Sequence, residues 1–184
     1  MKKKIIITGG LDYIGTELCK LYSGVSWHHN ITVIDNRFIS ERVNQIRNWN
    51  MNFIQGDILD KELIDKYLKD ADVVHHLAGV TDVPRTKDES SEAQDEKIKK
   101  VGEKGTQNIL DAISDSCKIV FPSTHVVYEG INHVKTDIKE NEITKPVLSY
   151  SSSKATNEKQ LKDSGKNYII LRLGSVYGYS TDSM

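Results

Sequence analysis

Short apolar runs rich in β-branched residues recur along the whole chain, and their alternation with helix-like stretches constrains the fold more than any other feature. Six such runs occur, at residues 5–8, 31–34, 52–54, 73–77, 118–121 and 168–171. Near-continuous apolar runs are typical of strands covered on both faces, as in a parallel sheet. The repeated alternation therefore predicts an α/β fold, a doubly wound parallel sheet with right-handed crossovers.

Three patterns predict helices between these runs. The first places Ile14, Leu18 and either Leu21 or Tyr22 on one face, and the second places Ile98, Val101, Gly105, Ile109 and either Ala112 or Ile113 in one stripe. The third begins at Ser149 or Tyr150 and ends at Gly165, because glycine is common at helix C-terminal caps. The charged segment 82–100 is interpreted as a solvated loop that leads into the second helix.

Composition excludes several classes of protein. The 184 residues carry 25 Lys and Arg against 26 Asp and Glu, and this net charge of −1 argues against nucleic-acid binding through bulk positive charge. No apolar stretch approaches the roughly 18 residues needed to span a bilayer, and the apolar run near the N-terminus is too short for a secretory signal. The two cysteines lie far apart without metal-ligand spacing. We therefore expect one cytoplasmic domain with no metal site, no nucleic-acid partner and no membrane span.

A glycine-rich turn, Thr8–Gly15, joins the first predicted strand to the first predicted helix. Such a turn brings backbone N–H groups and a helix N-terminus against a pyrophosphate. The second strand ends at Asp35, 20 residues beyond Gly15, where a carboxylate can accept a hydrogen bond from an adenosine ribose hydroxyl. Asp57 and Ile58 follow the third strand at the same edge of the sheet. These features together predict a dinucleotide site.

The turn resembles the loop T-G-G-x-G-[FY]-I-G of extended short-chain dehydrogenases/reductases, specifically the NAD-dependent nucleotide-sugar epimerase/dehydratase family. Asp12 replaces the middle glycine of this motif and adds a carboxylate at the point where the backbone should approach two phosphates. The turn itself can still form, because Asp tolerates the left-handed backbone angles that such a turn can require. Asp35 favours NAD because a carboxylate would repel the 2′-phosphate of NADP, whereas Arg37 could reach that phosphate. The motif His76–Gly79 resembles the family's H-x-A-[AG] turn, which makes His76 a structural residue. The resemblance implies NAD contacts from Gly9, Asp12, Tyr13, Ile14, Gly15, Asp35, Asn36, Asp57, Ile58, Leu77, Ala78, Gly79 and Lys154.

Tyr150 and Lys154 form a Y-x-x-x-K pair, which a helix places on one face. A phenol there can remove a proton from an alcohol while hydride leaves its carbon, and a nearby ammonium and the nicotinamide charge are expected to lower the pKa of Tyr150. Two further segments resemble family motifs. Residues 122–128 resemble S-[ST]-x-x-V-Y-G, with Thr124 at the hydroxyl position that contacts the reacting oxygen. Residues 172–178 resemble R-x-x-N-V-Y-G, with Ser175 in place of the asparagine that often contacts the substrate.

Departures from the family pattern narrow the expected function. His125 and Val126 stand where members that dehydrate a 4-keto sugar carry an Asp-Glu acid and base, and this argues against a 4,6-dehydratase. Gly102 replaces an asparagine, and Glu129 intervenes before the glycine of V-Y-G. Family members continue past this motif into a C-terminal substrate lid, which is apparently absent from residues 1–184, so we expect these residues to be the dinucleotide-binding domain with the Thr-Tyr-Lys set.

The resemblance implies an NAD-dependent nucleotide-sugar epimerase that acts through a transient keto sugar. Two alternatives remain: an NAD(P)-dependent nucleotide-sugar reductase or dehydrogenase, which would release its product instead of returning the hydride, and a catalytically weak NAD-binding module. The implied partners are a nucleotide-diphosphate sugar and a second copy of the chain, because family dimers pair two helices that correspond here to residues 92–113 and 150–162.

Overall fold

A computed structural model describes residues 2–80, 83–84 and 86–178. Six parallel strands form one sheet in the order β3-β2-β1-β4-β5-β6. Their bounds are β1 Lys4–Thr8, β2 Asn30–Asp35, β3 Asn52–Gln55, β4 Val73–His76, β5 Lys118–Thr124 and β6 Asn167–Leu173. The strand order reverses between β1 and β4, so the predicted doubly wound, Rossmann-like sheet is confirmed.

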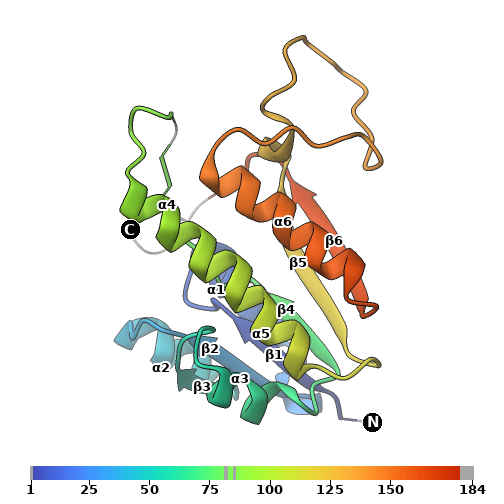
Figure 1. Ribbon diagram of the computed structural model, residues 1–184. Coiled ribbons are helices and arrows are strands. Elements are labelled where there is room, and N and C mark those ends of the chain that lie inside the picture. The colour runs from blue at the N-terminus through green and yellow to red at the C-terminus, as the bar shows by residue number, and fades with distance from the viewer. Residues whose placement is uncertain (1, 81–82, 85, 179–184) are drawn as a thin grey trace.

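Helices cover both faces of this sheet. Their bounds are α1 Tyr13–Ser23, α2 Ser40–Asn48, α3 Lys61–Leu68, α4 Glu92–Lys99, α5 Gly105–Ala112 and α6 Ser149–Asp163, with 3₁₀ turns at Ser26–His28 (η1) and His125–Tyr128 (η3). A π-helical turn, η2 at Lys100–Lys104, joins α4 to α5. Figure 1 shows α4 and α5 end to end over one face with α6 beside them, and α1 behind the sheet.

Two hydrophobic cores, one on each face, explain the strand sequences. In β1, Ile6 packs with α3, α5 and α6, whereas Ile5 and Ile7 pack with α1 and α2 on the opposite face. Successive side chains of a strand point to opposite faces, so a strand buried on both faces needs apolar residues at every position. The continuous apolar runs of β1, β2, β4 and β5 therefore correspond to the central strands. The run at residues 168–171 was wrongly expected to be covered on both faces: it forms β6 at the edge of the sheet, where Tyr168, Ile169 and Leu171 are 38%, 40% and 45% exposed.

The predicted face of α1 is partly wrong. Leu18 and Tyr22 pack against the core as predicted, and Gly15 and Cys19 are buried between them, whereas Ile14 is 38% exposed and Leu21 is 78% exposed. The helix is rotated because Gly15 lies so close to the preceding turn that a Cβ would overlap the Gly9 carbonyl oxygen. Close approach of backbone to backbone, rather than the largest apolar face, sets the orientation of α1.

The other two helical predictions are confirmed. Ile98, Ile109 and Ile113 of the second stripe are buried, and they face the sheet across the π-helical turn. The last helix begins at Ser149, and Gly165 follows it with a φ of +69°, the left-handed conformation that ends many helices. Residues 81–82 and 85, within or beside the predicted polar loop, lie outside the described residues.

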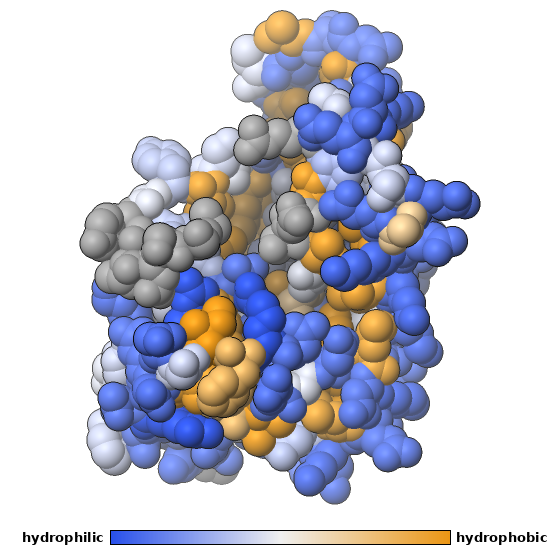
Figure 2. Space-filling view, turned by 90° about the vertical axis from the view of Figure 1, so that its left-hand side faces the viewer, coloured by the Kyte–Doolittle hydropathy of each residue, from blue (hydrophilic) through white to orange (hydrophobic). Residues whose placement is uncertain are grey.

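The segment between η3 and α6 projects from the body of the molecule (Figure 1). Figure 2 shows a mainly hydrophilic surface on the side where Figure 1 places α2 and the start of α4, with apolar residues in separate areas. The helices of the described residues are all too short or too polar to cross a bilayer.

Candidate functional site

A groove opens at the carboxyl edge of the sheet, where the strand order reverses between β1 and β4. Ligands of open parallel sheets bind at this position because the loops diverge there. The groove is lined by Gly9, Asp12, Ile34, Asp35, Asn36, Arg37, Gly56, Asp57, Ile58, Leu77, Ala78, Gly79, Val80, Lys97 and Val101. Most of the residues predicted for the dinucleotide are among them, and Tyr13, Ile14 and Gly15 form the adjoining first turn of α1.

The glycine turn is shaped as a phosphate cradle. Gly9 has a φ of +71°, and a Cβ on it would lie 2.6 Å from the backbone nitrogen of Ala78. The turn therefore passes close to the end of β4 and leads directly into α1. The Asp12 side chain does not cap the N–H groups of this first turn, so they remain suited to an anionic ligand. These residues fit a dinucleotide pyrophosphate.

Asp12 adopts an ordinary extended conformation, with φ −85° and ψ 174°. The turn therefore does not depend on the tolerance of Asp for left-handed angles, which the sequence analysis invoked. The Asp12 carboxylate lies 3.8 Å from the Arg37 guanidinium, and the Nε of Arg37 is also 3.3 Å from Asp35. Arg37 thus offsets part of the charge that Asp12 brings to the loop, a pairing that sequence reasoning missed.

Asp35 is buried at the end of β2 and organises both loops around it. Its Oδ2 accepts from the Leu11 backbone nitrogen at 3.0 Å, and its Oδ1 accepts from the Arg37 backbone nitrogen at 3.0 Å. Next to it, the Asn36 amide donates to Asp57 at 3.0 Å. The carboxylate that would accept from a ribose hydroxyl therefore also holds the glycine turn in place.

His76 is fully buried between two threonines. Its Nδ1 lies 3.0 Å from the Thr8 hydroxyl, and its Nε2 lies 3.0 Å from the Thr106 hydroxyl. Burial, together with the nearby Lys154 charge, lowers the pKa of His76 to about 3. The ring is therefore neutral at physiological pH and joins β1, β4 and α5, as predicted for a structural residue.

Tyr150 and Lys154 lie on the first turns of α6, which packs against β5. The Lys154 ammonium donates to the Pro122 carbonyl at 2.9 Å and lies 4.5 Å from the centroid of the Phe121 ring and 5.9 Å from that of Tyr150. Thr124, the last residue of β5, is two residues beyond Pro122. The packing of α6 on β5 therefore gathers the predicted catalytic set at one edge of the sheet.

The electrostatics of this pair differ from the expectation. Burial raises the pKa of Tyr150 above its ordinary value, and burial lowers the pKa of Lys154 to about 8. The ammonium is directed at a backbone carbonyl, so its charge alone does not lower the pKa of Tyr150. Any activation of the phenol must therefore come with the charges of bound ligands.

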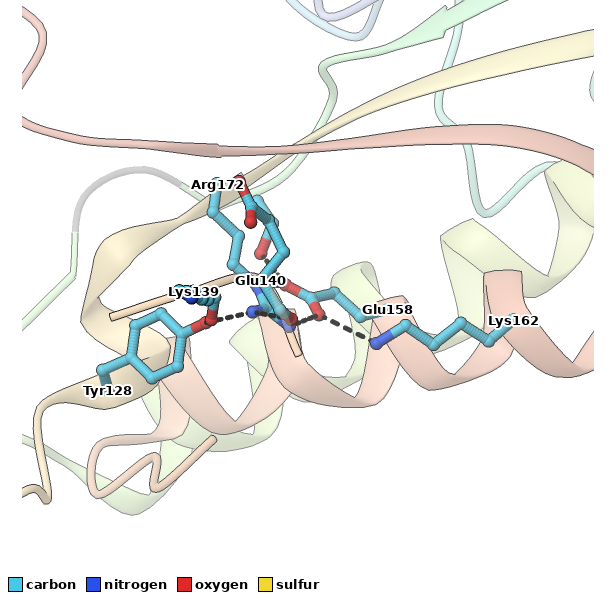
Figure 3. A network of polar contacts seen from close by, with 7 residues as sticks. Tyr128, Lys139, Glu140, Glu158, Lys162 and Arg172 are labelled. Atoms are coloured by element: carbon cyan, nitrogen blue, oxygen red, sulfur yellow. Dashed lines mark hydrogen bonds and ion pairs between the residues drawn. The ribbon is translucent and has the colours of Figure 1, made fainter. Parts of the chain in front are cut away.

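A buried ion pair holds α6 to β6 (Figure 3). Arg172 donates from its Nε to the Glu158 carboxylate at 2.8 Å and from its Nη2 at 2.6 Å. The Ser123 hydroxyl donates to the same carboxylate at 2.6 Å, and Lys162 lies 3.3 Å from it. Arg172 also contacts the Tyr128 hydroxyl at the end of η3. Arg172, the first residue of the last motif, therefore has a structural role. The motif was visible in the sequence, but the sequence did not indicate that Glu158 is its partner.

The remaining predicted residues lie near this edge. Ser175 is exposed just beyond β6. The Tyr13 hydroxyl lies against Gly178, so the first and last motifs meet. The His125 Nδ1 is 3.2 Å from the Leu173 carbonyl oxygen, on the β6 side of η3.

Gly102 has a packing role that its place in the family motif did not predict. It lies in the π-helical turn, where a Cβ would overlap the Ser153 hydroxyl, and its carbonyl accepts from the Asn157 amide at 3.1 Å. α6 therefore fills the space that an asparagine side chain at position 102 would need.

Comparisons with known proteins agree with this geometry. The model of the NAD dependent epimerase/dehydratase family matches residues 5–184. The chain is 27% identical to a dTDP-D-glucose 4,6-dehydratase of Dictyostelium discoideum, an alignment that covers 96% of this chain and 44% of that protein.

Two solved structures have a similar fold. One is a UDP-N-acetylglucosamine 4-epimerase of Methanobrevibacter ruminantium M1 in complex with UDP-N-acetylmuramic acid, with a TM-score of 0.75, 29% identity and coverage of 94% of this chain and 55% of that one. The other is a UDP-glucose 4-epimerase of Brucella ovis in complex with NAD, with a TM-score of 0.74, 28% identity and coverage of 92% and 51%. The chain spans about half the length of the relatives it matches.

Proposed function

Because the chain belongs to the NAD dependent epimerase/dehydratase family, we propose that residues 1–184 are the dinucleotide-binding and catalytic part of a nucleotide-sugar epimerase. Membership of this family bears out the predicted enzyme class and the predicted cofactor, NAD. We propose in addition that the reaction is an epimerisation, that the substrate is a nucleotide sugar and that the residues have the roles given below.

The observation that carries the proposal is the position of Tyr150 and Lys154 beside the end of β5, with the Lys154 charge close enough to His76 at the end of β4 to lower its pKa. A phenol in this position can take the proton of a sugar hydroxyl, and Thr124 can donate a hydrogen bond to the same oxygen. Lys154 would hold the cofactor's ribose hydroxyls, and the positive charge of the bound nicotinamide would favour the phenolate. When bound, NAD would supply a reversible hydride acceptor beside the sugar carbon.

Elimination of water is not supported, because the residues after Thr124 lack a carboxylic acid and base. Val126 has no titratable group, and the His125 ring contacts the Leu173 carbonyl on β6. An epimerase needs one proton acceptor and a reversible hydride transfer, whereas elimination needs a further acid and base. The available groups therefore favour epimerisation over dehydration.

The residues around the groove also favour NAD over NADP. Asp35 places a carboxylate at the end of β2, where it would repel the 2′-phosphate of NADP. Arg37, which could otherwise bind that phosphate, is paired with Asp35 and Asp12. We further propose a nucleotide-diphosphate sugar as substrate and a homodimer built on α4, α5 and α6.

Replacement of Tyr150 by Phe tests the function, because it removes one oxygen. In the complete gene product, assayed with UDP-glucose and UDP-N-acetylglucosamine, we expect kcat to fall by about 10³-fold, within the range of general acid–base contributions, with NAD affinity unchanged. Tyr168→Phe on β6 is the matched control and should keep full activity.

The stoichiometry of NAD separates the epimerase from the reductase. An epimerase converts many sugars for each NAD without net NADH formation, whereas steady NADH production or consumption would indicate a dehydrogenase or reductase. If the Phe variant keeps more than about a tenth of the rate, Tyr150 is not the base and His125 is the next residue to test. Absence of turnover in the parent protein would favour the binding module.

A further inference from the structure

Glu129 is the residue that interrupts the V-Y-G motif, and its carboxylate contacts the beginning of α6. Its Oε1 accepts from the backbone nitrogen of Val147 at 2.7 Å and from that of Leu148 at 2.8 Å. The Ser151 hydroxyl donates to the same oxygen. One carboxylate oxygen thus joins the end of η3 to the first turn of the helix that carries Tyr150.

The N-cap residue of α6 is Leu148, which has no acceptor in its side chain. The Ser151 hydroxyl oxygen accepts from the Val147 and Leu148 amides at 3.3 and 3.2 Å, and the Glu129 carboxylate makes the shorter and charged contacts with them. The first N–H groups of a helix lack partners within the helix and carry partial positive charge, so a carboxylate there is favourable. Partial burial raises the pKa of Glu129, but the hydrogen bonds from Ser151, Leu148 and Val147 outweigh this and hold the pKa below its ordinary value. Glu129 is therefore ionised at neutral pH.

The chain leaves the body of the molecule between these contacts. Residues 130–146, which we call the strap, form the projection in Figure 1. The two ends of the strap are joined at its base, where Gly130 N–H donates to the Lys145 carbonyl at 2.8 Å and Lys145 N–H donates to the Val127 carbonyl at 2.8 Å. The contacts of Glu129 lie next to these two hydrogen bonds and join the end of η3 to the beginning of α6.

We propose that Glu129 is a positioning residue, whose carboxylate fixes the first turn of α6, and with it the Tyr150 hydroxyl, relative to Thr124 at the end of β5. Thr124 lies immediately before η3, and Tyr150 is the second residue of α6. The hydrogen bond from Lys154 to the Pro122 carbonyl also joins α6 to β5, one turn further along the helix, whereas Glu129 contacts the turn that carries Tyr150. The inference rests on the proposed role of Tyr150 as the proton acceptor.

Variants of Glu129 in the complete gene product test this role with two measurements, amide hydrogen exchange and steady-state kinetics. In Glu129→Ala we expect the Val147 and Leu148 amides to exchange about tenfold faster, as on loss of a helix cap. We expect kcat to fall about tenfold with KM for the sugar and NAD affinity within twofold, because substrate and cofactor contacts remain.

Two further variants keep the test decisive. Glu129→Gln retains an acceptor oxygen, so it should recover much of the exchange protection and of kcat, and it removes the concern that the Ala variant misfolds. Glu142→Ala is the matched control, because Glu142 pairs with Lys135 within the strap and should change neither measurement.

Unchanged exchange in Glu129→Ala would overturn the bridge, and faster exchange with an unchanged kcat would overturn the positioning role. Loss of NAD binding in parallel with kcat would likewise contradict it, since that result indicates general loosening. A parent protein that shows no turnover refutes the proposed function and the positioning role together, while the exchange measurement still decides whether the bridge exists.

Discussion

The two ends of the site are held by charges of very different exposure. At the dinucleotide end, Arg37 and Asp12 lie 3.8 Å apart with side chains that are 47% and 38% exposed. At the catalytic end, Arg172 and Glu158 lie 2.6 Å apart with side chains that are 12% and 2% exposed. Water and salt weaken an exposed pair strongly and reach a buried pair much less.

The difference follows from what each end must do. The turn after β1 borders an open groove, so its charged side chains can change partners when a ligand binds. The junction of β5, β6 and α6 sets the position of Tyr150 and Lys154, and removal of either buried partner there would leave an uncompensated charge. An exposed ion pair of Arg37 with Asp12 and a buried ion pair of Arg172 with Glu158 thus lie along one sheet edge, while the buried Asp35 holds the glycine turn itself.

The largest expected effect is on the buried pair. Glu158→Ala leaves Arg172 without its carboxylate, and we expect the free energy of unfolding to fall by about 3–5 kcal/mol in urea denaturation. Asp163→Ala, which breaks an exposed pair with Lys159 on the same helix, should cost less than about 0.5 kcal/mol. Equal losses in the two variants would remove the contrast between the two ends.

Lys154 connects stability to pH. Its pKa of about 8 in the folded chain lies below the ordinary 10.5, so the folded state releases this proton first and gains stability relative to the unfolded state as pH rises from 8 to 10.5. Below pH 8, Lys154→Met should stabilise the chain by up to about 3 kcal/mol while abolishing activity.

The advantage of the Met variant should shrink as pH approaches 10.5, measured by denaturation at each pH. Lys159→Met, an exposed change on the same helix, should show no such trend. A pH-independent difference for Lys154→Met would mean that the ammonium is well solvated.

Asp35 tests cofactor choice at the other end. Asp35→Ala should weaken NAD binding about tenfold, the loss of one hydrogen bond to a charged group, and weaken NADP binding less. Calorimetric titration of both dinucleotides measures the difference. Asp60→Ala removes a carboxylate that caps α3 outside the groove and should lower stability without changing selectivity. Equal losses for NAD and NADP would make Asp35 a purely structural residue.

The smallest effect concerns Asp12. Because Asp12 is exposed and Arg37 offsets part of its charge, Asp12→Gly should tighten dinucleotide binding by less than about 1 kcal/mol, and added salt should reduce the gain further. The gain should be larger in an Arg37→Ala background, which a double-mutant cycle measures. Additive effects of the two substitutions would show that the pair is not coupled.

Much of the fold could be predicted because its signals are local. The six strands follow from runs of apolar residues, and the end of α6 follows from Gly165 with its positive φ. The groove was predictable for a similar reason, since the carboxyl ends of parallel strands must meet at one edge. The face of α1 was not, because the close contact between Gly15 and the Gly9 carbonyl outweighs the pattern of large apolar residues.

Local sequence is enough to predict the order of strands and helices along the chain, the glycine turn and the Tyr150–Lys154 spacing, because each depends on backbone conformation over a few residues. The tertiary structure decided which charges meet: Arg37 with Asp12, Arg172 with Glu158, and Glu129 with the first turn of α6. It also brought Lys97 of α4 to the groove. Long polar side chains pair with residues of elements that are distant in sequence, so local sequence does not indicate the partner. The free energy of each pair depends on its burial, which exists only once the chain has folded.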